Sequence, residues 1–303
     1  MPANQMLPIV LAHGIARFDI LLEIHRRKFN LPENLLSDEF QYFKNIKTHL
    51  ESHGFKPVFR TNQDFAGSAA LRAGQLRDRI NEIISETGAG KVHIIAHSMG
   101  GLDARRMIVD LAMADKVASL TTVGTPHLGT ILADRVIGNG GIFLIEILRK
   151  VVRLNLDGFK DLTITECEKF NRRAEEQEAT NNVFYQTYAS SEELNRVFVP
   201  LVPSWIFIRN IEGRNDGLVP FTSQQWKKEL VADDGRRKPV VQKEFPLPAD
   251  HLNQVGWWDL EESGNPFFGI SLIELIKQKL EYEGEIKNIY LEIARDLQQV
   301  IAS

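Results

Sequence analysis

The stretch VHIIAHSMGG, residues 92–101, decides the fold of this chain. It runs from an apolar strand pattern directly into small residues, with a single hydroxyl, that of Ser98, at the junction. A serine nucleophile in a tight strand-to-helix turn needs small residues two positions before and after it, because strand and helix pass closely there. Ala96 and Gly100 meet this requirement. The stretch therefore predicts a nucleophilic serine, and the alternative is a buried turn serine without a chemical role.

Apolar strand patterns and helical patterns alternate through the first 123 residues. Such alternation predicts parallel strands joined by crossover helices, in a doubly wound sheet covered on both faces. Ligands of these sheets bind beyond the carboxyl ends of the strands. The predicted strands are residues 7–11, 56–59, 92–96 and 117–123, and the predicted helices are residues 42–53, 69–86 and 101–113.

The alternation stops between Gly129 and about Thr187. We therefore predict one α/β domain over residues 1–303, with a helical cap or lid inserted at about residues 129–187. Further strands are predicted at residues 205–209 and 239–245, and further helices at residues 161–173 and 271–282.

Residues 142–154, IFLIEILRKVVRL, form a strongly amphipathic helical pattern within this insertion. One interpretation is a lid helix that shields a pocket and makes transient contact with a lipid surface when open. The other is a helix that simply packs on the core. Under the first interpretation an acyl pocket is lined by Phe143, Ile145, Leu148 and Val152.

A serine hydroxyl needs a base to remove its proton, and in this type of fold the acid and then the histidine follow the serine along the chain. His251, in the loop after the predicted strand at residues 239–245, is the predicted base. His127 comes directly after a strand, before any acid could intervene, and is predicted to be structural and to line the pocket floor. The other histidines precede or adjoin the serine: His13, His25, His49, His53, His93 and His97.

Asp216 is the predicted acid, in the turn RNDGLVP between Ser98 and His251. Its alternative interpretation is an ordinary Asp-Gly turn. Asp250 adjoins the predicted base in sequence and cannot readily orient its ring. Asp216 would fix the tautomer of the imidazole and stabilise its protonated form.

An oxyanion formed at this serine needs two preset N–H donors. The amide of Met99, next to the nucleophile, is the first predicted donor. The second is the amide of Ile15, in the loop after the first strand, where Gly14 lets the backbone turn inward. An ordinary glycine turn is the alternative for that loop.

Composition narrows the function classes. A net charge of −4 gives no electrostatic case for a nucleic-acid partner. The single cysteine, Cys167, excludes an intramolecular disulfide. The first residues lack the pattern of a signal peptide, and no apolar run approaches the roughly 18 residues that span a bilayer. We expect a cytoplasmic protein, with secretion left open and the oligomeric state undefined.

Five motifs occur in order along the chain: PIVLAHGIARFD, KVHIIAHSMGGLDAR, GTPHLGT, RNDGLVPFTSQQW and DHLNQVG. Together they resemble the bacterial true lipases, the triacylglycerol lipase group of the α/β-hydrolase fold. The resemblance implies the same site residues: Ser98, Asp216 and His251 as the triad, and Ile15 and Met99 as oxyanion donors. It also implies ester hydrolysis through an acyl-enzyme, a lipid or ester substrate, and a helical lid.

The chain departs from this family at its calcium ligands. Secreted relatives hold calcium partly through an aspartate two positions after the catalytic histidine, where this chain has Asn253. A second calcium aspartate has no clear match between Glu193 and Arg214. We therefore expect no cofactor, with calcium in doubt.

Two alternatives to a lipase or esterase stay open. The same triad serves phospholipases and acyltransferases, which differ in acyl donor or acceptor. A non-catalytic binding protein of the hydrolase fold is the other alternative, although such proteins usually lack a triad member.

Overall fold

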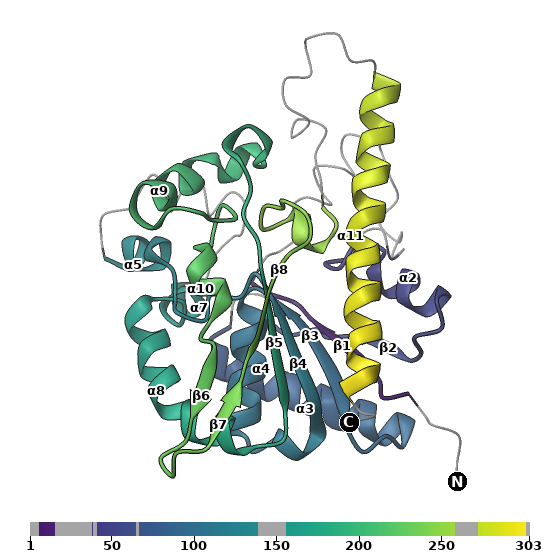
Figure 1. The fold of residues 1–303 in the computed structure, drawn as a ribbon, viewed down its shortest axis with the longest axis vertical. Coiled ribbons are helices and arrows are strands. Elements are labelled where there is room, and N and C mark those ends of the chain that lie inside the picture. The colour runs from purple at the N-terminus through teal and green to yellow at the C-terminus, as the bar shows by residue number, and fades with distance from the viewer. Residues whose placement is uncertain are drawn as a thin grey trace.

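The computed structural model describes residues 6–15, 38, 41–64, 67–138, 156–257 and 272–300. A six-stranded parallel sheet forms its centre, in the order β2-β1-β3-β4-β5-β8 (Figure 1). The strands are β1 (Ile9–Ala12), β2 (Val58–Arg60), β3 (Val92–His97), β4 (Val117–Val123), β5 (Phe184–Ala189) and β8 (Val241–Glu244). The predicted α/β class with a mostly parallel, doubly wound sheet is confirmed.

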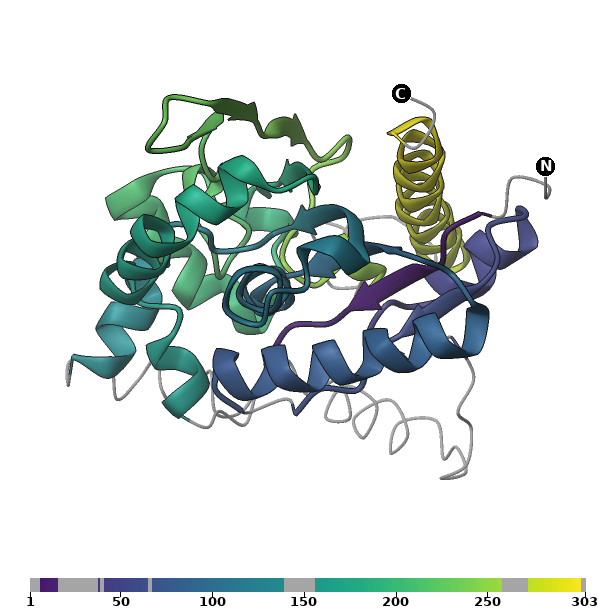
Figure 2. The ribbon, with the colours of Figure 1, turned by 90° about the horizontal axis from the view of Figure 1, so that it is seen from below.

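Helices cover both faces of this sheet, because successive strand residues point to opposite sides. In β1, Ile9 and Leu11 pack into one apolar cluster, and Val10 and Ala12 pack into another. Figure 2 shows the corresponding arrangement, with α3 on one side of β1 and α11 on the other. The first cluster includes α2 (Ile46–Ser52) and α11 (Leu272–Val300), and the second includes α3 (Ala69–Thr87), α4 (Met99–Asp110) and α8 (Ile164–Thr180).

Two long connections rise from the carboxyl ends of β4 and β5. The first contains α5 (Ile131–Ile137), α7 (Leu156–Lys160) and α8, and residues 139–155 lie outside the described part. The second contains the short 3-10 helices η3 (Leu194–Arg196) and η4 (Val199–Leu201), then α9 (Val202–Glu212) and α10 (Phe221–Gln225). It ends with the antiparallel pair β6 (Glu229–Val231) and β7 (Arg237–Pro239). Both connections therefore place chain above the end of the sheet where ligands of such folds bind.

One predicted strand was wrong, one strand was missed, and the last predicted helix is longer than expected. Residues 205–209 belong to α9 rather than to a strand: Trp205 and Ile208 are buried at helical spacing, and Pro203 in the first turn suits a helix start. The missed strand is β5, which begins inside the predicted insertion. It was not predicted because Gln186 and Thr187 are polar, although both are buried in the sheet. Residues 272–300 form one helix, α11, which passes through Gly284 without a break and so extends well beyond the predicted helix at residues 271–282.

Candidate active site

Ser98 lies in the turn between β3 and α4, where its backbone has φ 56° and ψ −135°. This positive φ is uncommon for a residue with a side chain and marks a strained, functional type of turn. Gly100 makes the turn possible, since a Cβ there would lie 2.7 Å from the carbonyl oxygens of Ala12 and His13. The requirement for a small residue two positions after the serine is thus a direct consequence of α4 passing close to the end of β1.

Ser98, His251 and Asp216 meet in one line of hydrogen bonds, although they come from three distant parts of the chain. His251 Nε2 lies 2.8 Å from Ser98 Oγ, and His251 Nδ1 lies 2.7 Å from Asp216 Oδ2. Asp216 is fully buried and His251 is nearly so. Because an ionised carboxylate only accepts, His251 Nδ1 carries the proton and its Nε2 is free to accept from the serine.

The loop after α9 holds the Asp216 carboxylate rigidly. Asp216 Oδ1 accepts from the amides of Leu218 at 3.0 Å and Val219 at 2.7 Å. The backbone carbonyl of Asp216 accepts from the amide of His251 at 2.8 Å. The acid loop and the histidine loop are therefore fixed to each other through both backbone and side chain.

The loop after β1 lies against the serine. A Cβ on Gly14 would be 2.7 Å from Ser98 Cβ and 3.1 Å from Ser98 Oγ, so only glycine fits at this approach. Ile15, the next residue, and Met99, the first residue of α4, are buried in one apolar cluster. Both amides predicted as oxyanion donors thus belong to segments that flank Ser98.

A buried ion pair that the sequence analysis missed supports this loop. Arg72 in α3 lies 2.7 Å from the carboxylate of Asp103 in α4, and both side chains are fully buried. The same guanidinium donates to the carbonyl of His13 at 2.8 Å. Arg72 looked like an ordinary charged residue of an amphipathic helix, and no pattern in the sequence marks it as buried.

His127 is enclosed in the protein and does not contact the triad side chains in the described part. Its Nε2 lies 2.8 Å from Thr122 Oγ1 and its Nδ1 lies 3.3 Å from Arg105 Nη1. Its ring also stacks on that of Trp226. Burial first, and then Arg105, hold the pKa of His127 well below its usual value. Both ring nitrogens are bonded and the residue has no exposed surface, which fits the structural interpretation of His127, and its place on the pocket floor stays a prediction.

The predicted acyl-pocket residues Phe143, Ile145, Leu148 and Val152 lie outside the described residues.

Asn253, at the calcium position of the secreted relatives, is engaged within its own loop. Its amide nitrogen donates to the carbonyl of Trp257 at 2.8 Å, and its amide oxygen accepts from the amide of Asp250 at 3.3 Å. The Asp250 carboxylate accepts backbone amides from Phe198, Leu252 and Asn253. These hydrogen bonds engage both side chains within the loop, and the expectation that calcium is not bound stays a prediction.

The fold and the line Asp216–His251–Ser98 define the class of the protein: a serine hydrolase of the α/β-hydrolase fold. A family model described as "Putative serine esterase (DUF676)" matches residues 9–229. The chain belongs to this family, and it is an ester hydrolase of the lipase and esterase kind.

Relatives agree with this assignment. The chain is 27% identical to Triacylglycerol lipase 2 of Saccharomyces cerevisiae, over 96% of this chain and 90% of the yeast protein. It is 34% identical to a triacylglycerol lipase of Pseudarthrobacter phenanthrenivorans, over 42% of this chain and 35% of that protein. The mature Bacillus licheniformis lipase BlEst2 shares the fold, with a TM-score of 0.59 at 18% identity over 83% of this chain and 87% of that one.

Across the described helices, none has the length and apolar character that crossing a membrane requires.

Proposed function

We propose that this chain hydrolyses acylglycerol-type esters through a covalent acyl-enzyme, with Ser98 as nucleophile, His251 as base and Asp216 as acid. The observation that carries the proposal is the continuous hydrogen-bond line from Asp216 Oδ2 through His251 to Ser98 Oγ. This line ends on a serine whose backbone strain directs its hydroxyl above the sheet.

The reaction proceeds in two halves. Ser98 Oγ attacks the ester carbonyl carbon while His251 Nε2 takes the serine proton, and the resulting imidazolium is stabilised by Asp216. The tetrahedral intermediate collapses, the alcohol leaves with the proton from His251, and the acyl group stays on Ser98. Water then gives a proton to His251 and attacks the acyl-enzyme carbonyl carbon. The second tetrahedral intermediate collapses, Ser98 Oγ leaves with the proton from His251, and the carboxylic acid is released.

The amides of Ile15 and Met99 stabilise the oxyanion in both halves. Preset backbone donors are effective because they need no reorganisation when the charge develops. The close approach of Gly14 to Ser98 and the support of His13 by Arg72 favour a loop that stays in place during turnover.

An apolar environment next to the serine supports an acyl substrate. Ile15 and Met99 share a cluster with Leu132 of α5 and Ile208 of α9, and the half-buried Phe207 packs against it. The name of the yeast relative, Triacylglycerol lipase 2, points to the same substrate class. We further propose transient contact with a lipid surface; the predicted lid helix at residues 142–154 lies outside the described residues.

Calcium is not required under this proposal, because Asn253 and Asp250 are committed to hydrogen bonds inside the histidine loop.

The test is hydrolysis of p-nitrophenyl esters from two to sixteen carbons, of a triacylglycerol emulsion and of phospholipid vesicles, with and without a chelator. Ser98→Ala is the matched variant, since it removes one oxygen and leaves the turn. We expect turnover of medium and long chains that chelator does not change and that Ser98→Ala lowers by about 10⁴-fold or more. Turnover that survives Ser98→Ala would overturn the mechanism, and turnover confined to short or phospholipid esters would overturn the substrate class.

A further inference from the structure

A second chain of hydrogen bonds ends on the same carboxylate oxygen as the triad. Gln254 Nε2 donates to Asp216 Oδ2 at 2.9 Å, the oxygen that also accepts from His251 Nδ1. On its other side, Gln254 Oε1 lies 3.0 Å from His97 Nε2, and His97 Nδ1 lies 2.7 Å from Tyr42 Oη. Three separate segments therefore meet behind the triad: the turn after residue 41, the end of β3 and the histidine loop.

The chemistry of the groups fixes the direction of every bond in this chain. The Asp216 carboxylate only accepts, so the nitrogen of the Gln254 amide must face it and the amide oxygen must face His97. His97 Nε2 then carries a proton and donates to that oxygen. Burial, followed by the proximity of His251, holds the pKa of His97 well below its usual value, so the ring is neutral. Its Nδ1 accordingly accepts from the Tyr42 hydroxyl.

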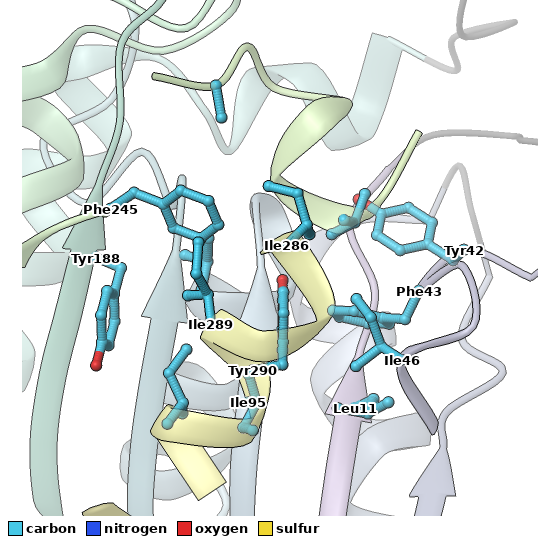
Figure 3. Packing of buried hydrophobic residues seen from close by; sticks show 14 of the residues in the cluster. Leu11, Tyr42, Phe43, Ile46, Ile95, Tyr188, Phe245, Ile286, Ile289 and Tyr290 are labelled. Atoms are coloured by element: carbon cyan, nitrogen blue, oxygen red, sulfur yellow. The ribbon is translucent and has the colours of Figure 1, made fainter. Parts of the chain in front are cut away.

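The surroundings leave the Gln254 amide no other arrangement. Gln254 and His97 are fully buried. The backbone carbonyl of Gln254, in the short 3-10 helix η5 (Asn253–Val255), accepts from Tyr290 Oη of α11 at 2.9 Å. A Cβ on Gly124 would collide with Gln254 Oε1 and lie 3.0 Å from its Cδ, so the amide fills the space that this glycine leaves. Figure 3 shows Tyr290 and Tyr42 in the packed layer beside this loop.

We propose that Gln254 is a positioning residue for the reaction: it holds the Asp216 carboxylate in line with His251 Nδ1, and His97 locks its amide. This inference rests on the proposed function, since it concerns the same triad. Asp216 must keep its orientation while the imidazolium forms, and a fourth donor on the carboxylate prevents its rotation. The rings of His97 and His251 are 4.6 Å apart, so a neutral His97 also avoids a second cation beside the imidazolium.

The first experiment compares two buried glutamines. Gln254→Met keeps the volume of the side chain and removes both hydrogen bonds. Gln186→Met is the control: Gln186 of β5 is also buried, and its amide donates to Thr121 Oγ1 of β4 at 2.7 Å inside the sheet. A hydrogen bond to a charged group corresponds to about tenfold or more in an equilibrium. We therefore expect Gln254→Met to lower kcat about tenfold with KM within about twofold, and Gln186→Met to lower Tm with kcat within about twofold.

The second experiment asks whether the effect passes through the carboxylate. In an Asp216→Ala background we expect Gln254→Met to change kcat by less than about twofold, because the carboxylate that Gln254 positions is gone. Losses that multiply in the double variant, or equal effects of the two glutamine variants on kcat, would overturn the inference. Should Gln254→Met yield no folded protein, Gln254→Asn takes its place in the same cycle, because the shorter amide reaches only one of its two partners.

Ser98→Ala, assayed alongside, separates the two hypotheses. If Ser98→Ala abolishes turnover while Gln254→Met behaves like Gln186→Met, only the role of Gln254 is wrong. If Ser98→Ala retains turnover, the proposed function itself is wrong and the role of Gln254 is wrong with it.

Discussion

Replacing Gly14 with alanine tests how closely the loop after β1 approaches the nucleophile. The added Cβ would lie 2.7 Å from Ser98 Cβ and 2.7 Å from Tyr42 Oη, whereas ordinary contacts begin at 3.4 Å. The loop must therefore retreat by about 0.7 Å, and the proposed Ile15 donor moves with it. A misplacement near 1 Å at a reacting centre reduces rates by about 100-fold. The loss of one oxyanion donor has a similar size, about 2.7 kcal/mol of transition-state stabilisation.

The assay is steady-state hydrolysis of p-nitrophenyl butyrate, with Tm measured on the same samples. We expect Gly14→Ala to lower kcat about 100-fold with a small change in KM, because the oxyanion develops only after substrate is bound. The control is Gly74→Ala in the interior of α3, where an added Cβ meets nothing within 4 Å. Alanine favours a helix over glycine by about 1 kcal/mol, so this variant should raise Tm and leave kcat unchanged.

A folded Gly14→Ala protein with wild-type kcat would refute the reasoning. It would mean that the loop does not lie against Ser98 during turnover, and the assignment of Ile15 as an oxyanion donor would fall with it.

Three further expectations follow from buried charges. Arg72→Met should lower kcat about tenfold or more, because the carbonyl of His13 loses its donor and the buried Asp103 loses its ion-pair partner. Unchanged steady-state kinetics would show that the loop after β1 does not need Arg72 to keep its position. Glu178→Gln should lower the free energy of unfolding by about 3 kcal/mol or more, since it removes the carboxylate paired with the buried Arg105. Asp110→Asn, at an exposed pair with Arg173, is the control and should change that free energy by less than about 1 kcal/mol. Equal losses of the two variants in urea unfolding would contradict this prediction. Tm should fall as the pH is lowered from 7 to 5, because burial lowers the pKa of His13 to about 3 and of His93 to about 4, so that only the unfolded chain gains these protons. Burial raises the pKa of Asp250 to about 7, so protonation of Asp250 stabilises the folded protein over the same range and makes the fall in Tm smaller. A Tm that rises on acidification would contradict this prediction.

The strands before the insertion were predictable because each is a short apolar run that ends at a helix or turn signal. The predicted strand at residues 117–123 coincides with β4 (Val117–Val123), and the predicted helix at residues 69–86 differs from α3 by one residue. Local pattern decides such elements when both faces of a strand are buried. It fails for β5, whose Gln186 donates to Thr121 Oγ1 inside the sheet, since a polar residue with a tertiary partner looks exposed in sequence.

The predicted site residues Ser98, Asp216 and His251 lie together, and the order of the motifs alone suggested that they would. What sequence could not provide is the supporting layer. His97 and Gln254 lie inside two of the motifs, but the roles of Arg72, His97 and Gln254 have no local signature, because they depend on groups between 31 and 157 residues away along the chain. Spacing along one helix or strand carries no information about contacts that only the finished fold creates.

The dependence of the histidine loop on α11 has a consequence for synthesis. Ser98 and its strained turn leave the ribosome long before His251, which is 153 residues further on, and before Tyr290, which holds the loop of His251 through Gln254. A nascent chain therefore carries its nucleophile without a base, and the hydroxyl is inert toward esters while translation continues. Under the proposed mechanism the serine becomes reactive only once His251 is in place, and the loop that carries His251 is held in turn by Tyr290 of α11.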